Sequence, residues 1–183
     1  SSNLVDAYKR NELEEATGLG IFALSAILVD KAEASEALRA NVVWSLGLEN
    51  PKYLLSSLQV NDFRSKKSVQ QEVDVKAEKG AYFVSTEIEL AADSSKEWML
   101  VANVNQNHSD IAKLSKLIRE DKSLSEKVNE NINLGTKKLV ELNAASDAIQ
   151  VSGDSLRDTR HFSNTLFNIM RGGIFDNSYQ IEK

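Results

Sequence analysis

The chain contains no cysteine, and that absence excludes several chemistries together. Disulfide bonds, thiolate zinc sites and cysteine nucleophiles all need the missing side chain. Histidine is nearly as scarce, since His108 and His161 are the only two, which argues against a multi-histidine metal site. We therefore expect no metal and no cofactor. A cysteine-free chain also fits a reducing compartment, so we expect a cytoplasmic protein.

Long apolar runs and excess positive charge are missing too. No run approaches the roughly 18–20 apolar residues that a membrane-spanning helix needs, so no membrane partner is expected. The 22 Lys and Arg residues are outnumbered by 27 Asp and Glu, which gives a net charge of −5. Binding to a nucleic-acid backbone requires a basic face, so nucleic acid is not an expected partner either. The 183 residues suffice for one domain or a domain and a half.

Short runs of β-forming residues, separated by turn residues, fill the first half of the chain. The first 20 residues are polar, with a turn at Gly18–Gly20, and the only proline, Pro51, belongs to a second turn. The predicted strands are residues 21–29, 39–46, 53–60, 69–76, 81–90 and 97–104. This arrangement predicts an antiparallel β-sandwich. Core packing is the preferred role for Trp44 and Trp98, with stacking on a ligand as the alternative.

The apolar period changes at residue 105 from two to about 3.6, which is typical of helices. Helices are predicted at 109–120 and from 124 to 149, the second opened by a capping box of Ser123 and Glu126. Gly135 is expected to bend or break this second helix. Asp154 is the expected N-cap of a last helix, and Gly172 and Gly173 are expected to close it. We therefore expect an α+β fold with a sandwich portion at 1–104, a helical linker at 105–153 and the start of a further helical region at 154–183.

The last helix carries the candidate site, in the segment 160–173 (RHFSNTLFNIMRGG). One face is apolar, with Phe162, Leu166, Ile169 and Met170 at helical spacing. A second face is polar, and its members are Arg157, Arg160, His161, Asn164, Asn168 and Arg171. Arginine suits phosphate, carboxylates and sugar hydroxyls, and an asparagine amide donates and accepts at once. We take Arg160, His161, Asn164, Asn168 and Arg171 as candidate substrate-binding residues. The alternative is a polar face bonded to neighbouring parts of the protein.

No complete catalytic set is recognisable. The carboxylates of 12–15 are best explained as a solvated run, and those of Glu87 and Glu89 as the polar face of a strand. The glycines of 18–20 lack the lysine and hydroxyl of a phosphate-binding loop. Asp158, His161 and Ser163 lie too close on one helix to form a catalytic triad. We therefore predict no catalytic residue.

The run RHFSNTLFNIMRGGIFDNSY resembles a known family, as do LSAILVDKAEASEALRANVVWSLGLE and KEWMLVANVNQ before it. That family is the inverting glycoside phosphorylases related to cellobiose phosphorylase, most nearly the 1,2-β-oligoglucan phosphorylase branch. The resemblance implies a supersandwich-like β domain, a helical linker and then an (α/α)₆ barrel. It implies a parent enzyme that transfers a glucosyl unit from a β-glucan oligosaccharide to inorganic phosphate without a metal. Homodimers are a further expectation of the resemblance.

The general acid of these enzymes lies in the barrel, which this chain lacks, so we expect no activity from the chain alone. The sequence begins with Ser1 and not with an initiator methionine, and a new pattern of apolar residues begins at 174–181. We therefore expect the chain to be a piece of a longer protein. The first hypothesis is thus a non-catalytic sandwich-plus-linker portion of a β-glucan phosphorylase. The alternative is a free-standing carbohydrate-binding or protein-interaction module, in which Trp44 or Trp98 stacks on a sugar.

Overall fold

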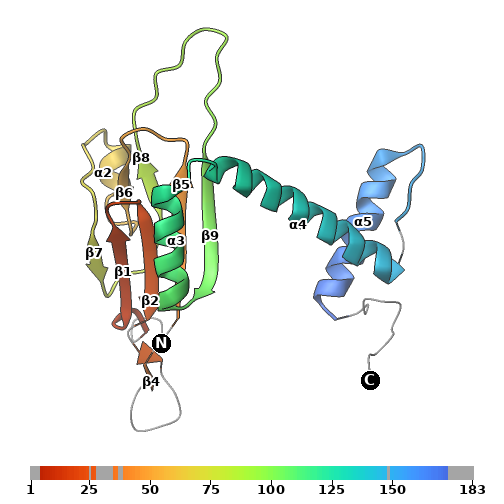
Figure 1. Cartoon of the computed structure of the whole chain (residues 1–183), viewed down its shortest axis with the longest axis horizontal. Coiled ribbons are helices and arrows are strands. Elements are labelled where there is room, and N and C mark those ends of the chain that lie inside the picture. The colour runs from red at the N-terminus through yellow and green to blue at the C-terminus, as the bar shows by residue number, and fades with distance from the viewer. Residues whose placement is uncertain (1–4, 25, 28–34, 37–38, 148, 173–183) are drawn as a thin grey trace. The chain divides into compact units, whose positions relative to one another are not determined.

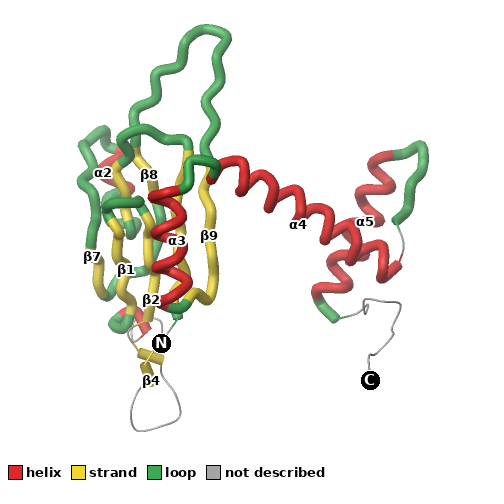
Figure 2. The backbone as a smooth tube through the Cα atoms, viewed as in Figure 1, coloured by secondary structure: helices red, strands yellow, loops and turns green. Residues whose placement is uncertain are grey.

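A computed structural model describes residues 5–24, 26–27, 35–36, 39–147 and 149–172 (Figure 1). The chain divides into two compact units, residues 1–122 and 123–183. The first unit is a β-sheet with helices, and the second is a pair of helices (Figure 2).

The first unit is organised around a five-stranded sheet of strand order β7-β1-β2-β5-β9, in which every neighbouring pair is antiparallel. Its strands are β1 (Lys9–Glu14), β2 (Leu19–Leu24), β5 (Ala40–Leu46), β7 (Asp74–Lys76) and β9 (Met99–Gln106). Two smaller sheets pair β3 (Ala26–Ile27) with β4 (Ser35–Glu36), and β6 (Lys52–Leu54) with β8 (Phe83–Ser85). The unit also contains the helices α2 (Val60–Arg64) and α3 (His108–Glu120). The predicted mixture of antiparallel sheet and helices is confirmed.

The core of this unit lies along β2 and β5, where Leu19, Val42 and Trp44 are almost fully buried. The indole Nε1 of Trp44 donates a hydrogen bond to Oδ1 of Asn103 on β9, 3.2 Å away. A buried indole needs such an acceptor, because an unpaired N–H in the core costs free energy. The predicted core role of Trp44 is therefore correct.

Tyrosines close the turn between β1 and β2. The hydroxyl of Tyr82 donates to the backbone carbonyl of Gly18 at 2.6 Å, and burial raises the pKa of that phenol. Gly18 has φ of +71°, and a Cβ there would lie 2.2 Å from the ring of Tyr53. Both the left-handed backbone and the close ring require glycine at the predicted turn.

Several strands differ from their predicted extent. β1 lies within the stretch expected to be polar coil, and β2 begins at Leu19 and ends at Leu24, while most of 25–29 lies outside the described residues. The predicted strands 53–60, 69–76 and 81–90 contain only the three-residue strands β6, β7 and β8. α2 begins where the first of these was expected to end. The strands are short here because hydrogen bonds to side chains replace backbone bonds between strands. For example, the backbone amide of Leu55 donates to the carboxylate of Glu72 at 2.7 Å.

The helices agree more closely with the sequence. α3 starts after Asn107, which forms a capping box with Asp110. In the second unit, α4 (Leu124–Asp147) begins directly after Ser123 and is unbroken at Gly135, so the expected break is absent. α5 (Ser155–Met170) has Asp154 as its N-cap, as predicted. It ends at Met170, and Gly172, just beyond the C-cap Arg171, has φ of +77°, the left-handed geometry of a C-terminal glycine. Gly173 lies outside the described residues.

α3 belongs to the same compact unit as the sheet. The hydroxyl of Ser115, which is 7% exposed, donates to the carboxylate of Glu14 on β1 at 2.7 Å. The guanidinium of Arg119 donates to the same hydroxyl at 3.3 Å. The bond to Glu14 ties the helix to the sheet, and the bond from Arg119, within the helix, holds the Ser115 hydroxyl in place.

Candidate binding surface on the last helix

The polar face predicted from the sequence exists on α5. Arg160 and Asn164 are exposed, and His161 and Asn168 are half-buried. Arg171 is the C-cap residue and is exposed too. The helical repeat of 3.6 residues brings these side chains to one side of the helix.

The two asparagines form a connected pair. Nδ2 of Asn168 donates to the backbone carbonyl of Asn164 at 2.8 Å and lies 3.3 Å from its side-chain Oδ1. The amide of Asn168 is thereby held in one orientation, while its own Oδ1 and the Nδ2 of Asn164 remain able to bond a ligand. At the end of the helix, the guanidinium of Arg171 stacks over the ring of Phe167, 5.5 Å from its centroid. This contact restrains a long side chain beside the asparagines.

His161 is held from the other helix. Its Nε2 lies 3.6 Å from the carboxylate of Asp147, the last residue of α4, and its side chain is 31% exposed. Of the predicted site residues, His161 is thus the one that joins α5 to α4. It serves the packing of the helix pair more directly than it serves a ligand.

The N-terminal turn of α5 is rigidly capped. Asp154 accepts from the amides of Leu156 and Arg157. Asp158 accepts from the amide and the hydroxyl of Ser152, each at 2.8 Å. These two bonds, the backbone one first, hold the pKa of Asp158 below its usual range. The negative charge of Asp158 is therefore engaged in the loop between the helices.

The predicted apolar face is only partly buried. Thr165 is the buried residue of α5, at 2% exposed, whereas Phe162, Leu166 and Ile169 are half-buried. Met170 remains 77% exposed, contrary to the expectation for this face. The stripe is therefore partly shielded from solvent from Phe162 to Ile169 but not at Met170.

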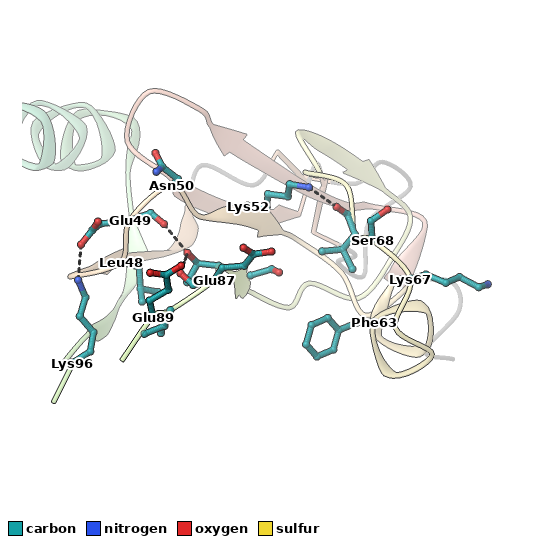
Figure 3. A pocket seen from close by; sticks show the side chains of 14 residues that line it. Leu48, Glu49, Asn50, Lys52, Phe63, Lys67, Ser68, Glu87, Glu89 and Lys96 are labelled. Carbon is teal, nitrogen blue, oxygen red and sulfur yellow. Dashed lines mark hydrogen bonds and ion pairs between the residues drawn. The ribbon is translucent and has the colours of Figure 1, made fainter. Parts of the chain in front are cut away.

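A second candidate is a hollow of about 750 Å³ in the first unit (Figure 3). It lies beside the loop that joins β8 to β9, which Figure 1 shows as a long excursion from the sheet. Lys96 bonds the carboxylate of Glu49 at 2.7 Å and lowers its pKa, and the hydroxyl of Thr86 donates to the Glu49 carbonyl at 2.6 Å. These bonds fasten both ends of the loop to one residue.

The carboxylates of Glu87 and Glu89 also line this hollow, on the loop after β8 rather than on the predicted strand face. Both side chains are exposed to solvent, so nothing marks them as an acid and base pair. Glu14 was expected to be solvated, but it is half-buried and bonded to Ser115. Within the described residues, no group of three or more side chains that could ligate a metal occurs.

Trp98 lies at the surface, which the sequence did not predict. It is 52% exposed, against the predicted core position, and it lines an apolar hollow of about 570 Å³ together with Phe63, Phe83 and Leu100. Phe63 is 62% exposed and also borders the charged hollow of Figure 3. The position of Trp98 just before β9, next to Glu97 and Lys96, was the one available indication of a strand end at the surface.

No family model matches the chain, and no curated protein matches it in sequence. Among the described helices, none is both long and apolar enough to cross a bilayer.

Proposed function

We propose that the chain is a non-catalytic β-sandwich-plus-linker portion of a carbohydrate-active enzyme. The parent enzyme phosphorolyses a β-glucan and transfers a glucosyl unit to inorganic phosphate. In this proposal the five-stranded sheet and the small β6–β8 sheet are parts of the sandwich, α4 is a linker helix, and α5 borders the substrate site.

The observation that carries the proposal is the exposed, internally ordered polar face of α5. Asn164 and Asn168 present amide groups, and Arg160 and Arg171 present guanidinium groups, from one rigid helix. Paired amides suit sugar hydroxyls, and guanidinium forks suit phosphate. No carboxylic acid lies among these residues, so the face can bind both substrates of a phosphorolysis but cannot protonate a leaving group.

The second unit also supports a role within a larger assembly. The buried residues of its helices are only Leu124, Asn143 and Thr165, while apolar side chains such as Ile132 and Met170 are more than half exposed. A helix pair that buries so little apolar surface is stabilised weakly by itself.

The test is a phosphorolysis assay on the protein in its full natural length, supplied with β-linked gluco-oligosaccharides and inorganic phosphate. We expect α-glucose 1-phosphate, the inverted product, and none from residues 1–183 alone. Asn164→Ala and Arg171→Ala should each raise KM for oligosaccharide or phosphate about tenfold, because each removes a hydrogen bond worth roughly 1–3 kcal/mol. Ser163→Ala, an exposed position beside that face, is the matched control. The absence of any phosphate-dependent product removes the proposal.

A second candidate, a carbohydrate-binding module, is favoured by one observation, the exposure of Trp98 beside Phe63. Exposed aromatic rings stack on the apolar faces of sugars. If this candidate is right, added β-glucan quenches tryptophan fluorescence of the chain, and Trp98→Ala abolishes the quenching. Emission that does not respond to glucan rejects it.

A further inference from the structure

The surface of α4 carries an apolar stripe that α5 covers only at one end. Spacings of four and three residues connect its members, which are Leu124, Val128, Ile132, Gly135, Leu139, Leu142 and Ser146. At 3.6 residues per turn, all of them lie within about 40° of one line along the helix. This is the seam that a helix presents to another helix.

α5 packs on the C-terminal part of the seam. Nδ2 of Asn143, which is 1% exposed and adjacent to the seam, donates to the backbone carbonyl of Phe162 on α5 at 2.9 Å. Leu142 and Ser146 are half-buried there. Figure 1 shows α5 crossing α4 near the end of the longer helix.

The seam continues beyond this contact without cover. Every residue from 129 to 141 is exposed, including Ile132 at 56% and Leu139 at 38%. Gly135 lies between them, and a Cβ at that position would meet no atom within 4 Å. Glycine inside a helix lowers its stability relative to alanine, and nothing in the described residues requires it. A closely approaching second backbone would require it.

The flanks of the seam indicate what kind of helix fits. Positions beside a two-stranded coiled coil are commonly charged, because ion pairs there select the partner. On α4 these flanking positions are Asn129, Asn131, Thr136, Lys138, Asn143 and Ala145, with a single charge. Flanks with one charge among six positions are better suited to burial on both sides within a helical array than to charge-selected pairing of two copies in solution.

We propose that the seam from Val128 to Leu139 receives a helix of the parent protein's own helical region, which lies beside α5 and crosses α4 at Gly135. The identity of this occupant rests on the proposed function, whereas the seam itself rests on its continuity with the α4–α5 contact. The incoming helix carries apolar side chains at the same spacing and brings its backbone close to Gly135.

Residues 1–183 contain no cysteine, so a thiol introduced there can be followed by labelling and peptide mapping. Single variants Ile132→Cys and Leu139→Cys report on the seam, and Leu134→Cys, which is exposed on another side of α4, is the matched control. In residues 1–183 alone, we expect all three thiols to react at similar rates. In the protein of full natural length, we expect the seam thiols to react at least tenfold more slowly than the control.

Equal labelling of seam and control in the full-length protein overturns the inference. Protection that is already present in residues 1–183 and fades on dilution assigns the seam to a second copy, and overturns the proposed occupant. Slow labelling in a full-length protein that lacks phosphorylase activity leaves the seam in place and removes only the proposed function. Fast labelling of the seam thiols in a full-length protein that is an active phosphorylase removes the seam inference and leaves the proposed function in place.

Gly135→Leu gives a second readout that does not depend on labelling. In residues 1–183 the variant should increase helicity and make unfolding about fivefold less favourable, because leucine is the better helix former. In the full-length protein the same side chain would occupy the space of the incoming helix, so the melting temperature should fall. A higher melting temperature of the variant both in residues 1–183 and in the full-length protein contradicts the inference.

Discussion

The hydroxyl of Ser115 on α3 donates a hydrogen bond of 2.7 Å to the carboxylate of Glu14 on β1, across 101 residues of sequence. The same carboxylate accepts a second bond of 2.7 Å from the hydroxyl of Thr17. Glu14 therefore joins the first hairpin of the sheet to the helix that follows its last strand. A polar bond, rather than apolar burial alone, holds α3 in place.

Ser115→Ala should destabilise the first unit by about 1–3 kcal/mol, since the half-buried carboxylate of Glu14 then loses one of its two hydroxyl donors. Ser109→Ala, an exposed serine of the same helix, should change stability little. Urea unfolding followed by circular dichroism measures both. Equal stability of the two variants would show that the bond contributes nothing.

The two tryptophans should differ in their response to acrylamide. Trp44 is 3% exposed and Trp98 is 52% exposed. Trp44→Phe leaves the exposed indole, so its emission should be strongly quenched and red-shifted. Trp98→Phe leaves the buried indole, whose emission should be shielded and blue-shifted. Similar quenching constants for both variants would contradict the placement of Trp98.

Ser152→Ala should raise the pKa of Asp158 towards its ordinary value of 3.8, because the variant removes the hydroxyl bond that lowers it. A lowered folded-state pKa stabilises the loop above the pKa of the unfolded chain, and this stabilisation is lost as pH falls through the folded-state value. The variant should therefore show a weaker acid dependence of helix-pair stability. An NMR titration of the Asp158 carboxyl, with Ser155→Ala as control, measures the shift.

Asn143→Leu should stabilise the α4–α5 pair relative to Asn143→Ala. The Oδ1 of Asn143 is buried and accepts no hydrogen bond from any described residue, so the amide lowers the stability of this helix crossing. Leucine has a similar volume and removes the unpaired acceptor, whereas alanine leaves a cavity that costs about 2–5 kcal/mol for a large side chain. The melting temperatures of the unmodified protein and the two variants, measured by thermal unfolding, rank their stabilities. A leucine variant less stable than the alanine variant would refute this account.

The helices and β5 could be predicted because their burial follows the periods of the sequence. Ala40, Val42 and Trp44 alternate with less buried neighbours, as a half-buried strand requires. The caps of α5, Asp154 and Gly172, are local features that depend on few other residues. Where structure was set by nearby residues, the sequence was a reliable guide.

β1 could not be predicted, since its pattern looks polar. Its most buried residue is Asn11, at 2% exposed, whose amide donates to the carbonyl of Glu78, 67 residues away. Only tertiary structure supplies that acceptor. The exposure of Trp98 has the same origin, because it depends on which strands lie beyond β9. For the candidate site, helical spacing predicted the shared face of α5, but not that Asp147 engages His161.

The outer edge of β9 has a practical consequence. β9 is the last strand of the sheet order, and among the described strands none pairs with its far side, while Leu100 and Val104 are 57% and 70% exposed. The eight residues of β9 therefore have backbone groups unpaired on one side, next to exposed apolar side chains. Such an edge is a template on which strands from other molecules can add. Concentrated solutions of residues 1–183 should therefore aggregate by edge-to-edge growth, and a lysine at Val104 should delay it.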